Sequence, residues 1–501
     1  MVLNILEIFG TKYFPTQYTV HIVALIAAIF ALRAYSQGRA TNRERDLHAR
    51  TILITGGLTP FTLTLIHELA TRGAHIIALS PHPIDSPRVS LIIDALRTTT
   101  SNEHIYAEQC DLLSPASIQL FCKRFLTGEV KRLDALLFTH EYPHIGSLRR
   151  LRSKSKAEED TQREKLSLAS FLLTTLLLPS LLTAPTERDI RIINVVNRFY
   201  AAASSPSFSS TLYHPIHTSE TPAIKSIFLA EGLRSLRTII LTRHLQRILD
   251  ALPAAHIPKT DSQSTAIPVV NPDSQKSNIV AVTVSPGISR ADTIARILNA
   301  DWTSSSGYST FGTLLYLLFL PLLQITTKSS VAAVQSVLHA LFLPTPFKLL
   351  SQQTPQTQTR SQSQGGTNDS LIDRSFTDSP EEVLKPGALY AECAVVKLRV
   401  PSPPLEEQNE DGDEKKETQE KGKGKTKEKG KTKALDRETM DLPDDGELGG
   451  ELAGRRVWEA YEAALAAWEK ENMTLEELEK DAKEAAEQQA VKVEGVSSGS
   501  D

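Results

Sequence analysis

The chain has 501 residues, and 41% of them are apolar, which is close to ordinary globular usage and excludes a wholly disordered protein. Its 55 basic and 59 acidic residues give a net charge of −4, which argues against a nucleic-acid-binding protein whose affinity depends on a basic surface. Three cysteines are too few for a disulfide scaffold or a zinc cluster, so a reducing compartment is the simplest interpretation.

The first predicted element is an apolar helix near the N-terminus. The run Thr19–Ala34 is interrupted only by His21 and Arg33, and its length is at the lower edge of the ~17–25 residues that a helix needs to span a bilayer. More basic residues follow this run than precede it, which predicts a membrane anchor over 18–36 with the rest of the chain on the cytoplasmic side. The alternatives are a helix lying on a membrane surface, a monotopic hairpin formed with 1–14, and a core helix.

From residue 51 onward, short β-branched runs alternate with helical periodicities. This alternation predicts βαβ units, and therefore an α/β protein with a doubly wound, Rossmann-like parallel sheet of about seven strands. The predicted strands are 51–55, 75–80, 105–110, 133–138, 191–196, 278–285 and 389–398. The predicted helices are 62–72, 86–98, 115–126, 166–182 and 224–252.

Polar segments at 253–277, 351–385 and 402–447 interrupt this pattern. The third contains the tract KGKGKTKEKGKTK, and because acidic residues flank it we expect a solvated, disordered insert in preference to a contact with anionic lipid or RNA. A helix over Arg455–Lys470 carries an apolar stripe that fits it to dock on the domain. The predicted divisions are an N-terminal segment (1–17), the anchor (18–36), the Rossmann-like domain (46–400), the charged insert (401–450), a helical segment (451–488) and a tail (489–501).

Four stretches of the sequence carry a family resemblance. They are TGGLTPFT (55–62), CDL (110–112), the strand pair LDALLF (133–138) and RIINVVN (191–197), and VSPGISRADT (284–293). In this order they resemble the short-chain dehydrogenase/reductase superfamily, in particular its membrane-associated, retinol-dehydrogenase-like branch. The resemblance covers about 51–400 and the closing helix, and it implies a nucleotide-binding fold.

The resemblance implies that the chain binds NAD or NADP. A dinucleotide pyrophosphate sits at the N-terminus of the first helix, where glycines let the backbone approach closely. Here Pro60 and Thr62 stand where the family motif TGxxxGxG has its later glycines. The second strand ends at Ser80 without the acidic residue or the arginine that would select between the two cofactors. The implied cofactor-binding residues are Thr55, Gly56, Gly57, Thr59, Thr62, Ser80, Asp111, Pro286, Gly287 and Thr293.

The catalytic positions of the family are substituted. The family uses a tyrosine, a lysine four residues later, a serine after the fifth strand and an asparagine on the preceding helix. The corresponding positions here hold Glu231, Ser235, Asn197 and Leu166. Glu231 would donate a proton only if burial favoured its protonated form, with Arg234 or Arg237 as the cation near the ribose. A different alignment pairs Tyr213 with His217, but Pro215 between them argues against one shared helical face.

Two further features suggest other chemistry. His140, Glu141 and His144 follow the fourth strand at the edge where α/β proteins bind ligands, but no further ligand set at a recognisable spacing supports a metal site, so we predict none. The apolar run 314–323 lies where the family has its substrate lid. Its hydrophobicity suits a lipophilic substrate, a second membrane contact or a buried core helix.

Two hypotheses about function follow. The first is a membrane-anchored, NAD(P)-dependent oxidoreductase of lipophilic alcohols or ketones with substituted catalytic residues. The second is a catalytically inactive relative that acts as a membrane-bound scaffold or regulator, because losing general acid–base groups typically costs ~10²–10⁴-fold in rate for each. The resemblance favours the endoplasmic reticulum surface or a lipid droplet over the mitochondrial outer membrane. The expected partners are a lipid membrane and a lipophilic small molecule, without nucleic acid.

Overall fold

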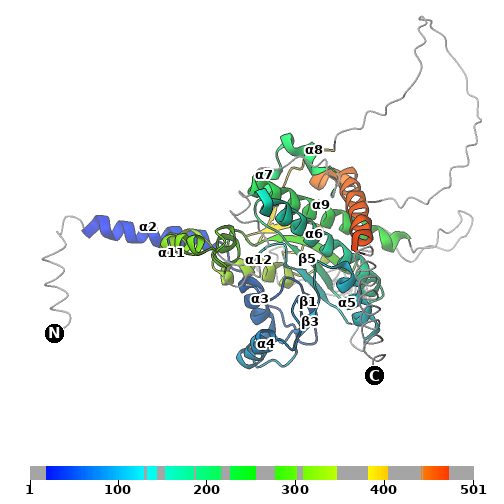
Figure 1. The fold of residues 1–501 in the computed structure, drawn as a ribbon, viewed down its shortest axis with the longest axis horizontal. Coiled ribbons are helices and arrows are strands. Elements are labelled where there is room, and N and C mark those ends of the chain that lie inside the picture. Colours follow the sequence, from blue (N-terminus) through cyan, green and yellow to red (C-terminus); the bar gives the residue numbers. More distant parts are fainter. Residues whose placement is uncertain are drawn as a thin grey trace, which may run out of the picture.

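The structure is a computed structural model whose central feature is a single twisted sheet covered by helices on both faces (Figure 1). The predicted inserts at 253–277, 351–385 and 402–447 lie largely outside the residues that it describes. The described residues are 19–128, 132–143, 153–185, 188–214, 216, 226–255, 277–301, 309–346, 382–403, 442 and 444–472.

The sheet confirms the predicted doubly wound α/β architecture. Its eight strands have the order β3-β2-β1-β4-β5-β6-β7-β8, and all neighbouring pairs are parallel except β7 and β8. The order reverses between β1 and β4, which is the topological switch point where such sheets bind ligands. The strands are β1 Thr51–Ile54, β2 His75–Ser80, β3 Ile105–Gln109, β4 Ala135–Phe138, β5 Ile190–Val195, β6 Ile279–Ser285, β7 Leu389–Ala391 and β8 Ala394–Val396.

The sequence of the central strands explains their burial. Every residue of β1, β4, β5 and β6 is buried, and these strands read as nearly continuous β-branched and aliphatic runs. Such runs are typical of parallel strands that have helices on both faces. The apolar side chains of the described residues accordingly form two clusters, one on each face of the sheet.

The helices divide between these two faces. One face is covered by α3 (Pro60–Ala70), α4 (Pro87–Thr100) and α12 (Ser330–Phe342). The other is covered by α5 (Pro115–Thr127), α6 (Ser153–Leu182), α9 (Ile227–Ala255) and the helix over 450–472. The shorter elements are α7 Tyr200–Ala203, η3 Pro206–Phe208, α8 Ser209–Leu212, the π-helical turn η5 Arg290–Ile294, α10 Ala295–Ile297 and η6 Glu447–Gly449.

The prediction of one continuous strand over 389–398 is wrong. The chain turns at Glu392 and Cys393, which both have positive φ angles, and returns as the antiparallel strand β8. Periodicity does not reveal such a turn, because neither residue is glycine or asparagine. Helix α6 also begins ahead of the predicted start at 166, and α12 was not predicted.

Two apolar helices project from the body side by side (Figure 1). They are α2 (Thr19–Gln37), which confirms the predicted N-terminal helix, and α11 (Thr310–Thr326). By length and composition Val20–Gln37 could cross a membrane, and none of it is buried, whereas the second such segment, Glu159–Leu182, is mostly core. The exposed large side chains of the pair are Val20, Val23, Leu25, Ile26, Ile29, Phe30, Leu32, Tyr35, Phe311, Leu314, Leu317, Leu318, Phe319 and Leu322. The run 314–323 is therefore not a buried core helix.

The segment between α2 and β1 is hydrogen-bonded to the body. The side chain of Gln37 donates to the carbonyl of Thr327 (3.1 Å) and accepts from the backbone N–H of Ser329 (3.1 Å), the N-cap of α12. Further along, the N–H of Thr41 donates to the side chain of Gln335 (3.3 Å). The α2 helix is thus joined to the helix that covers the sheet.

Candidate functional site

The candidate site lies at the switch point, where the loops that follow β1 and β4 meet. Five side chains from these loops and from the start of α3 are nine-tenths or more buried. They form a chain of hydrogen bonds: His140 Nδ1 to Thr55 Oγ1 (2.6 Å), Thr139 Oγ1 to the carbonyl of Thr55, Thr62 Oγ1 to Thr139 Oγ1 (3.1 Å) and Thr59 Oγ1 to Thr62 Oγ1 (2.9 Å). The hydroxyls of Thr59 and Thr62, predicted as cofactor ligands, are thus engaged within the protein.

The two glycines of the first loop were expected to let the backbone approach a cofactor closely. Gly56 has a φ of +106°, and a Cβ there would lie 2.5 Å from Thr139 Oγ1, so only glycine fits between these loops. The N–H of Gly57 donates to the carbonyl of Leu79 at the end of β2 (3.2 Å). The close approach at Gly56 is therefore to another loop of the protein.

The N-terminus of α3 is closed by protein groups. Pro60 has no N–H, the N–H of Phe61 donates to Asp292 Oδ1 (3.0 Å), and the N–H of Thr62 donates to the hydroxyl of Thr59 (3.4 Å). A carboxylate from the loop after β6 therefore lies where an anionic ligand would meet this helix.

The loop after β6 is tied to the loop after β4 as well. Gly287 has a φ of +98°, and its carbonyl accepts a hydrogen bond from the fully buried hydroxyl of Tyr142 (3.1 Å). Burial raises the pKa of Tyr142 above its ordinary range. The Tyr142 ring packs against Phe61 with 4.8 Å between ring centroids, and Thr293 Oγ1 accepts from the N–H of Ser289 (3.3 Å).

The remaining predicted cofactor residues lie at the ends of β2, β3 and β6. Ser80 is buried and its hydroxyl accepts from the N–H of His82 (3.2 Å). Asp111 is partly exposed and caps the following turn by accepting from the N–H of Leu113 (3.0 Å). Pro286 is buried beside Gly287. The predicted set thus gathers along one edge of the sheet, as the strand order requires.

The residues present do not fit a dinucleotide pyrophosphate in this arrangement. The first turn of α3 has no N–H left to donate, and bulk replaces glycine where the backbone of a phosphate-binding turn must be approached closely.

The predicted acid–base position is part of a buried ion-pair cluster. Glu231 is fully buried, with one carboxylate oxygen 2.6 Å from Arg163 Nε and the other 2.7 Å from Arg234 Nη2. Two guanidinium groups at these distances stabilise the ionised carboxylate, which accepts hydrogen bonds and has no proton to donate. Ser235, at the position of the family lysine, is also buried and supplies no positive charge.

Asn197 joins the same network through the backbone of Glu141. The Glu141 carbonyl accepts from Arg234 Nη2 (2.7 Å) and from Asn197 Nδ2 (3.2 Å). Its carboxyl group accepts from the hydroxyls of Thr238 (3.0 Å) and Ser170 (3.3 Å), and burial raises its pKa above the ordinary range. The structure therefore brings Asn197 and Glu231 together.

Tyr213 lies outside this network. Its hydroxyl donates to the carbonyl of Pro401 (2.7 Å), and burial raises its pKa to about 12. Its proposed partner, His217, is outside the described residues. The contacts of Tyr213 are thus those of a residue that fastens the 401 segment.

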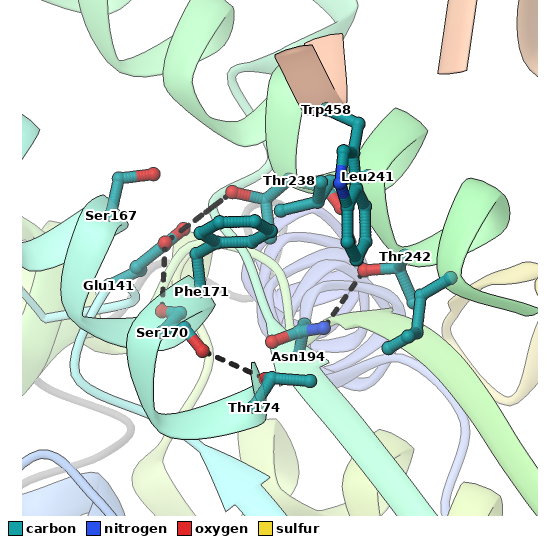
Figure 2. A pocket seen from close by; sticks show the side chains of 11 residues that line it. Glu141, Ser167, Ser170, Phe171, Thr174, Asn194, Thr238, Leu241, Thr242 and Trp458 are labelled. Carbon is teal, nitrogen blue, oxygen red and sulfur yellow. Dashed lines mark hydrogen bonds between the residues drawn. The ribbon is translucent and has the colours of Figure 1, made fainter. Parts of the chain in front are cut away.

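A small cavity lies behind the cluster, between α6, α9 and the helix over 450–472. Figure 2 shows polar groups of Glu141, Ser170 and Thr238 on one side and the rings of Phe171 and Trp458 across from them. Its volume is about 20 Å³, which is room for about one water molecule and not for an alcohol or ketone substrate.

The alternative metal site is not formed by the described residues. Across the described parts of the chain, no three His, Cys, Asp or Glu side chains are grouped to hold a metal ion, and His144 lies outside them. Burial lowers the pKa of His140 to about 4, and its Nε2 lies 2.9 Å from the carbonyl of Leu166. His140 is therefore a neutral structural side chain.

Three residues of this site were not found from the sequence. Arg163 is one of several charged residues in a polar stretch, and Tyr142 and Asp292 lie inside stretches that were examined for other residues. A signal was present for Asp292, because it is an acidic residue between the Pro-Gly pair and Thr293 in a region expected to border an anionic cofactor.

Comparisons with known proteins point to one superfamily. No family model matches the chain. An uncharacterized oxidoreductase, pbr1, of Schizosaccharomyces pombe is 24% identical over 332 residues, covering 66% of this chain and 79% of that protein. The uncharacterized oxidoreductase YNL181W of Saccharomyces cerevisiae is 27% identical, covering 67% and 78%. Human retinol dehydrogenase 13 is 27% identical over 170 residues, covering 34% and 49%.

Solved structures with similarity to the chain are short-chain dehydrogenases. One from Shigella flexneri, complexed with NADP, has a TM-score of 0.35 and 14% identity, covering 58% of this chain and 93% of its own. A short-chain oxidoreductase from Pseudomonas aeruginosa with an atypical catalytic centre has a TM-score of 0.35, covering 59% and 90%. TM-scores of this size do not establish the fold. The fold assignment depends on the strand order of the sheet.

Proposed function

On the premise of membership in the short-chain dehydrogenase/reductase superfamily, which the sequence relatives support, we propose that this chain is a membrane-bound scaffold or regulator whose inherited site no longer performs acid–base chemistry. The observation that carries the proposal is the burial of Glu231 between Arg163 and Arg234. A group in that environment maintains structure, because it neither reaches solvent nor holds a transferable proton.

The missing groups make catalysis at this position slow. The tyrosine, lysine and serine of the family are all replaced, and each lost acid–base group typically costs ~10²–10⁴-fold in rate. This observation supports a protein whose partners recognise its surface.

The second candidate is a membrane-bound, NAD(P)-dependent oxidoreductase of lipophilic alcohols or ketones. The names of the two fungal relatives favour it, and oxidoreductase is the class of activity that the relationship supports. A nicotinamide cofactor belongs to this candidate, and Ser80 at the end of β2 leaves the choice between NAD and NADP open. It requires Glu231 to leave its two ion pairs before it could act on a substrate.

The membrane part of the proposal rests on α2 and α11. Their exposed apolar side chains form a surface whose contact with water is unfavourable. The hydrocarbon interior of a bilayer would solvate the same surface favourably. The excess of basic residues after α2 supports a cytoplasmic body. We place the chain at the endoplasmic reticulum or a lipid droplet in preference to the mitochondrial outer membrane, with a bilayer as its first partner.

The two candidates are separated by a turnover assay on the full chain in lipid nanodiscs. NADPH or NADH oxidation is followed with a series of long-chain ketones, and the reverse reaction with the corresponding alcohols. We expect no turnover above that of empty nanodiscs. Turnover above that level in the wild-type chain would establish the oxidoreductase and defeat the scaffold, and its persistence in Tyr213→Phe would exclude that tyrosine as the proton donor.

A further inference from the structure

We propose that Asp292 is an internal ligand for the N-terminus of α3, and that its carboxylate closes this chain to the pyrophosphate of NAD and NADP. The inference rests on the proposed function and extends it. The proposed function concerns proton transfer at Glu231, and this inference concerns cofactor binding at α3. It rests on residues of α3, of the loop after β6 and of the loop after β4, and it does not use the ion pairs of Glu231.

The first step is the supply of hydrogen-bond donors. A helix N-terminus binds phosphate because its first N–H groups have no partner within the helix. In α3 the first position is Pro60, the N–H of Phe61 donates to Asp292 Oδ1 at 3.0 Å, and that of Thr62 donates to Thr59. The first turn therefore has no free donor for a second anion.

The second step is the way Asp292 is held. Its side chain is almost completely buried, and its other oxygen, Oδ2, accepts a hydrogen bond from the hydroxyl of Ser289 (3.0 Å). The same hydroxyl accepts from the N–H of Asp292 (2.9 Å), and the N–H of Ser289 is bound by Thr293 (3.3 Å). One carboxylate oxygen is thus fixed by the turn that carries it, and the other by the N–H of Phe61 in α3.

The third step is electrostatic. The N-terminus of a helix carries a partial positive charge that favours a carboxylate or a phosphate placed against it. Asp292 supplies the negative charge from within the chain, and a dinucleotide would have to displace it together with the Tyr142–Phe61 contact beside it. Displacement would leave a buried carboxylate without its partner, which is costly.

The fourth step is steric. Thr62 takes the place of the glycine that allows a phosphate-binding turn to be approached closely, and its hydroxyl is bonded to Thr139 across the crevice (3.1 Å). The substitutions at Pro60, Thr62 and Asp292 therefore have a single explanation, because each removes or fills one part of an anion site.

The test uses the full chain in lipid nanodiscs with NADPH and NADH as the probes. Isothermal titration calorimetry measures binding, and amide hydrogen exchange of peptides covering 58–66 reports the first turn of α3. The variants are Asp292→Ala, which removes the acceptor, and Asp292→Asn, which keeps an acceptor and removes the charge. Asp94→Asn, on the exposed surface of α4, is the matched control.

We expect no saturable binding of either cofactor to the wild-type chain up to ~1 mM. We expect Asp292→Ala to lower Tm by about 2–4 °C and to speed exchange in 58–66, Asp292→Asn to do so less, and Asp94→Asn to change neither. Because Asp292→Asn keeps the shape of the side chain, it provides this comparison even where the alanine variant fails to fold.

Two results would overturn the inference. Saturable binding of NADPH or NADH to the wild-type chain, with protection of 58–66, would show that the anion site is open. Unchanged Tm and exchange in both Asp292 variants would show that the carboxylate does not cap the helix. Binding without turnover defeats this inference and leaves the proposed function standing, whereas binding with turnover defeats both.

Discussion

Two regions of the molecule reverse the usual distribution of polar and apolar groups. The Glu231 cluster places charges in the interior, and the α2–α11 pair places large apolar side chains outside it. In the cluster each carboxylate oxygen of Glu231 lies within 2.7 Å of an arginine nitrogen. In the helix pair, by contrast, Leu314 and Leu318 are 66% and 71% exposed.

The comparison separates buried charges that stabilise the fold from exposed apolar side chains that indicate a function. A buried charge is compensated when it is paired inside the chain, and each carboxylate oxygen of Glu231 has an arginine beside it. An exposed apolar surface remains unfavourable in water until something covers it. The site that resembles an enzyme thus pairs its charges internally, whereas the exposed apolar surface of α2 and α11 supports the proposed contact with a membrane.

The largest expected effect comes from breaking the cluster. Glu231→Gln removes the carboxylate that pairs with Arg163 and Arg234, of which Arg163 keeps its contact with Asp160, and we expect it to lower the free energy of unfolding by about 3 kcal/mol. Chemical denaturation of the nanodisc-bound chain measures it. The control is Glu459→Gln, whose half-exposed side chain pairs with Arg455 at 3.0 Å and should contribute at most about 1 kcal/mol. Equal stability of the two variants would mean that the cluster is not structural.

The apolar pair is tested by placing a charge on it. Ile26→Lys, near the middle of α2, should weaken membrane association by about 2.5–3.5 kcal/mol, because a lysine at the centre of a bilayer is poorly solvated. Flotation with liposomes and carbonate extraction both report it. Leu91→Lys, on the exposed face of α4, should float like the wild type. If Ile26→Lys floats equally well, α2 does not enter the bilayer.

The pH dependence of stability sharpens the view that the crevice is structural. Burial lowers the pKa of His140 to about 4, so below its ordinary value near 6.5 the unfolded chain takes up a proton that the folded chain does not. Stability is therefore full above about pH 6.5 and falls between about pH 6.5 and 4, by on the order of 3 kcal/mol from this residue.

Denaturant unfolding at pH 7.5 and pH 5 measures this loss, and His140→Asn should reduce it. The variant is needed because burial also lowers the pKa of His244 to about 4, which acts in the same direction. A pH dependence identical in the variant and the wild type would assign the whole effect elsewhere.

The smallest expected effect concerns the tie between the two loops. Tyr142→Phe removes the hydrogen bond to the carbonyl of Gly287 and should lower the free energy of unfolding by about 1 kcal/mol. Tyr106→Phe, on the partly exposed strand β3, is the matched control and should cost less. A larger loss of stability in Tyr106→Phe than in Tyr142→Phe would show that the Tyr142 hydrogen bond does not stabilise the crevice.

The sequence predicted the sheet well, because parallel strands and their covering helices leave strong periodic signals. The runs at 51–55, 75–80 and 278–285 are strands at nearly the predicted limits. The hairpin at Glu392–Cys393 was missed. Both residues have positive φ angles, but glutamate and cysteine are not among the residue types that usually indicate a turn.

The site was predicted only by position. The resemblance put Asn197 after the fifth strand and Glu231 on the long helix, and the structure links both to the loop after β4 through the carbonyl of Glu141 and Arg234. Arg234 lies three residues from Glu231 on the same helix, but Arg163 comes from α6 and Glu141 from the loop after β4, so no local pattern contained Arg163. The structure also shows why Pro60 and Thr62 are tolerated, since Asp292 and Thr139 complement them.

The junction at Gln37 has a mechanical consequence. Its side chain bridges the end of α11 and the N-cap of α12, and the following residues are bonded along α12 to Gln335. Hydrogen bonds therefore hold the C-terminal end of α2, the helix that would contact lipid, against α12, which covers the sheet. Under the proposed membrane association, a bilayer that holds α2 would also set the tilt of the body through these hydrogen bonds.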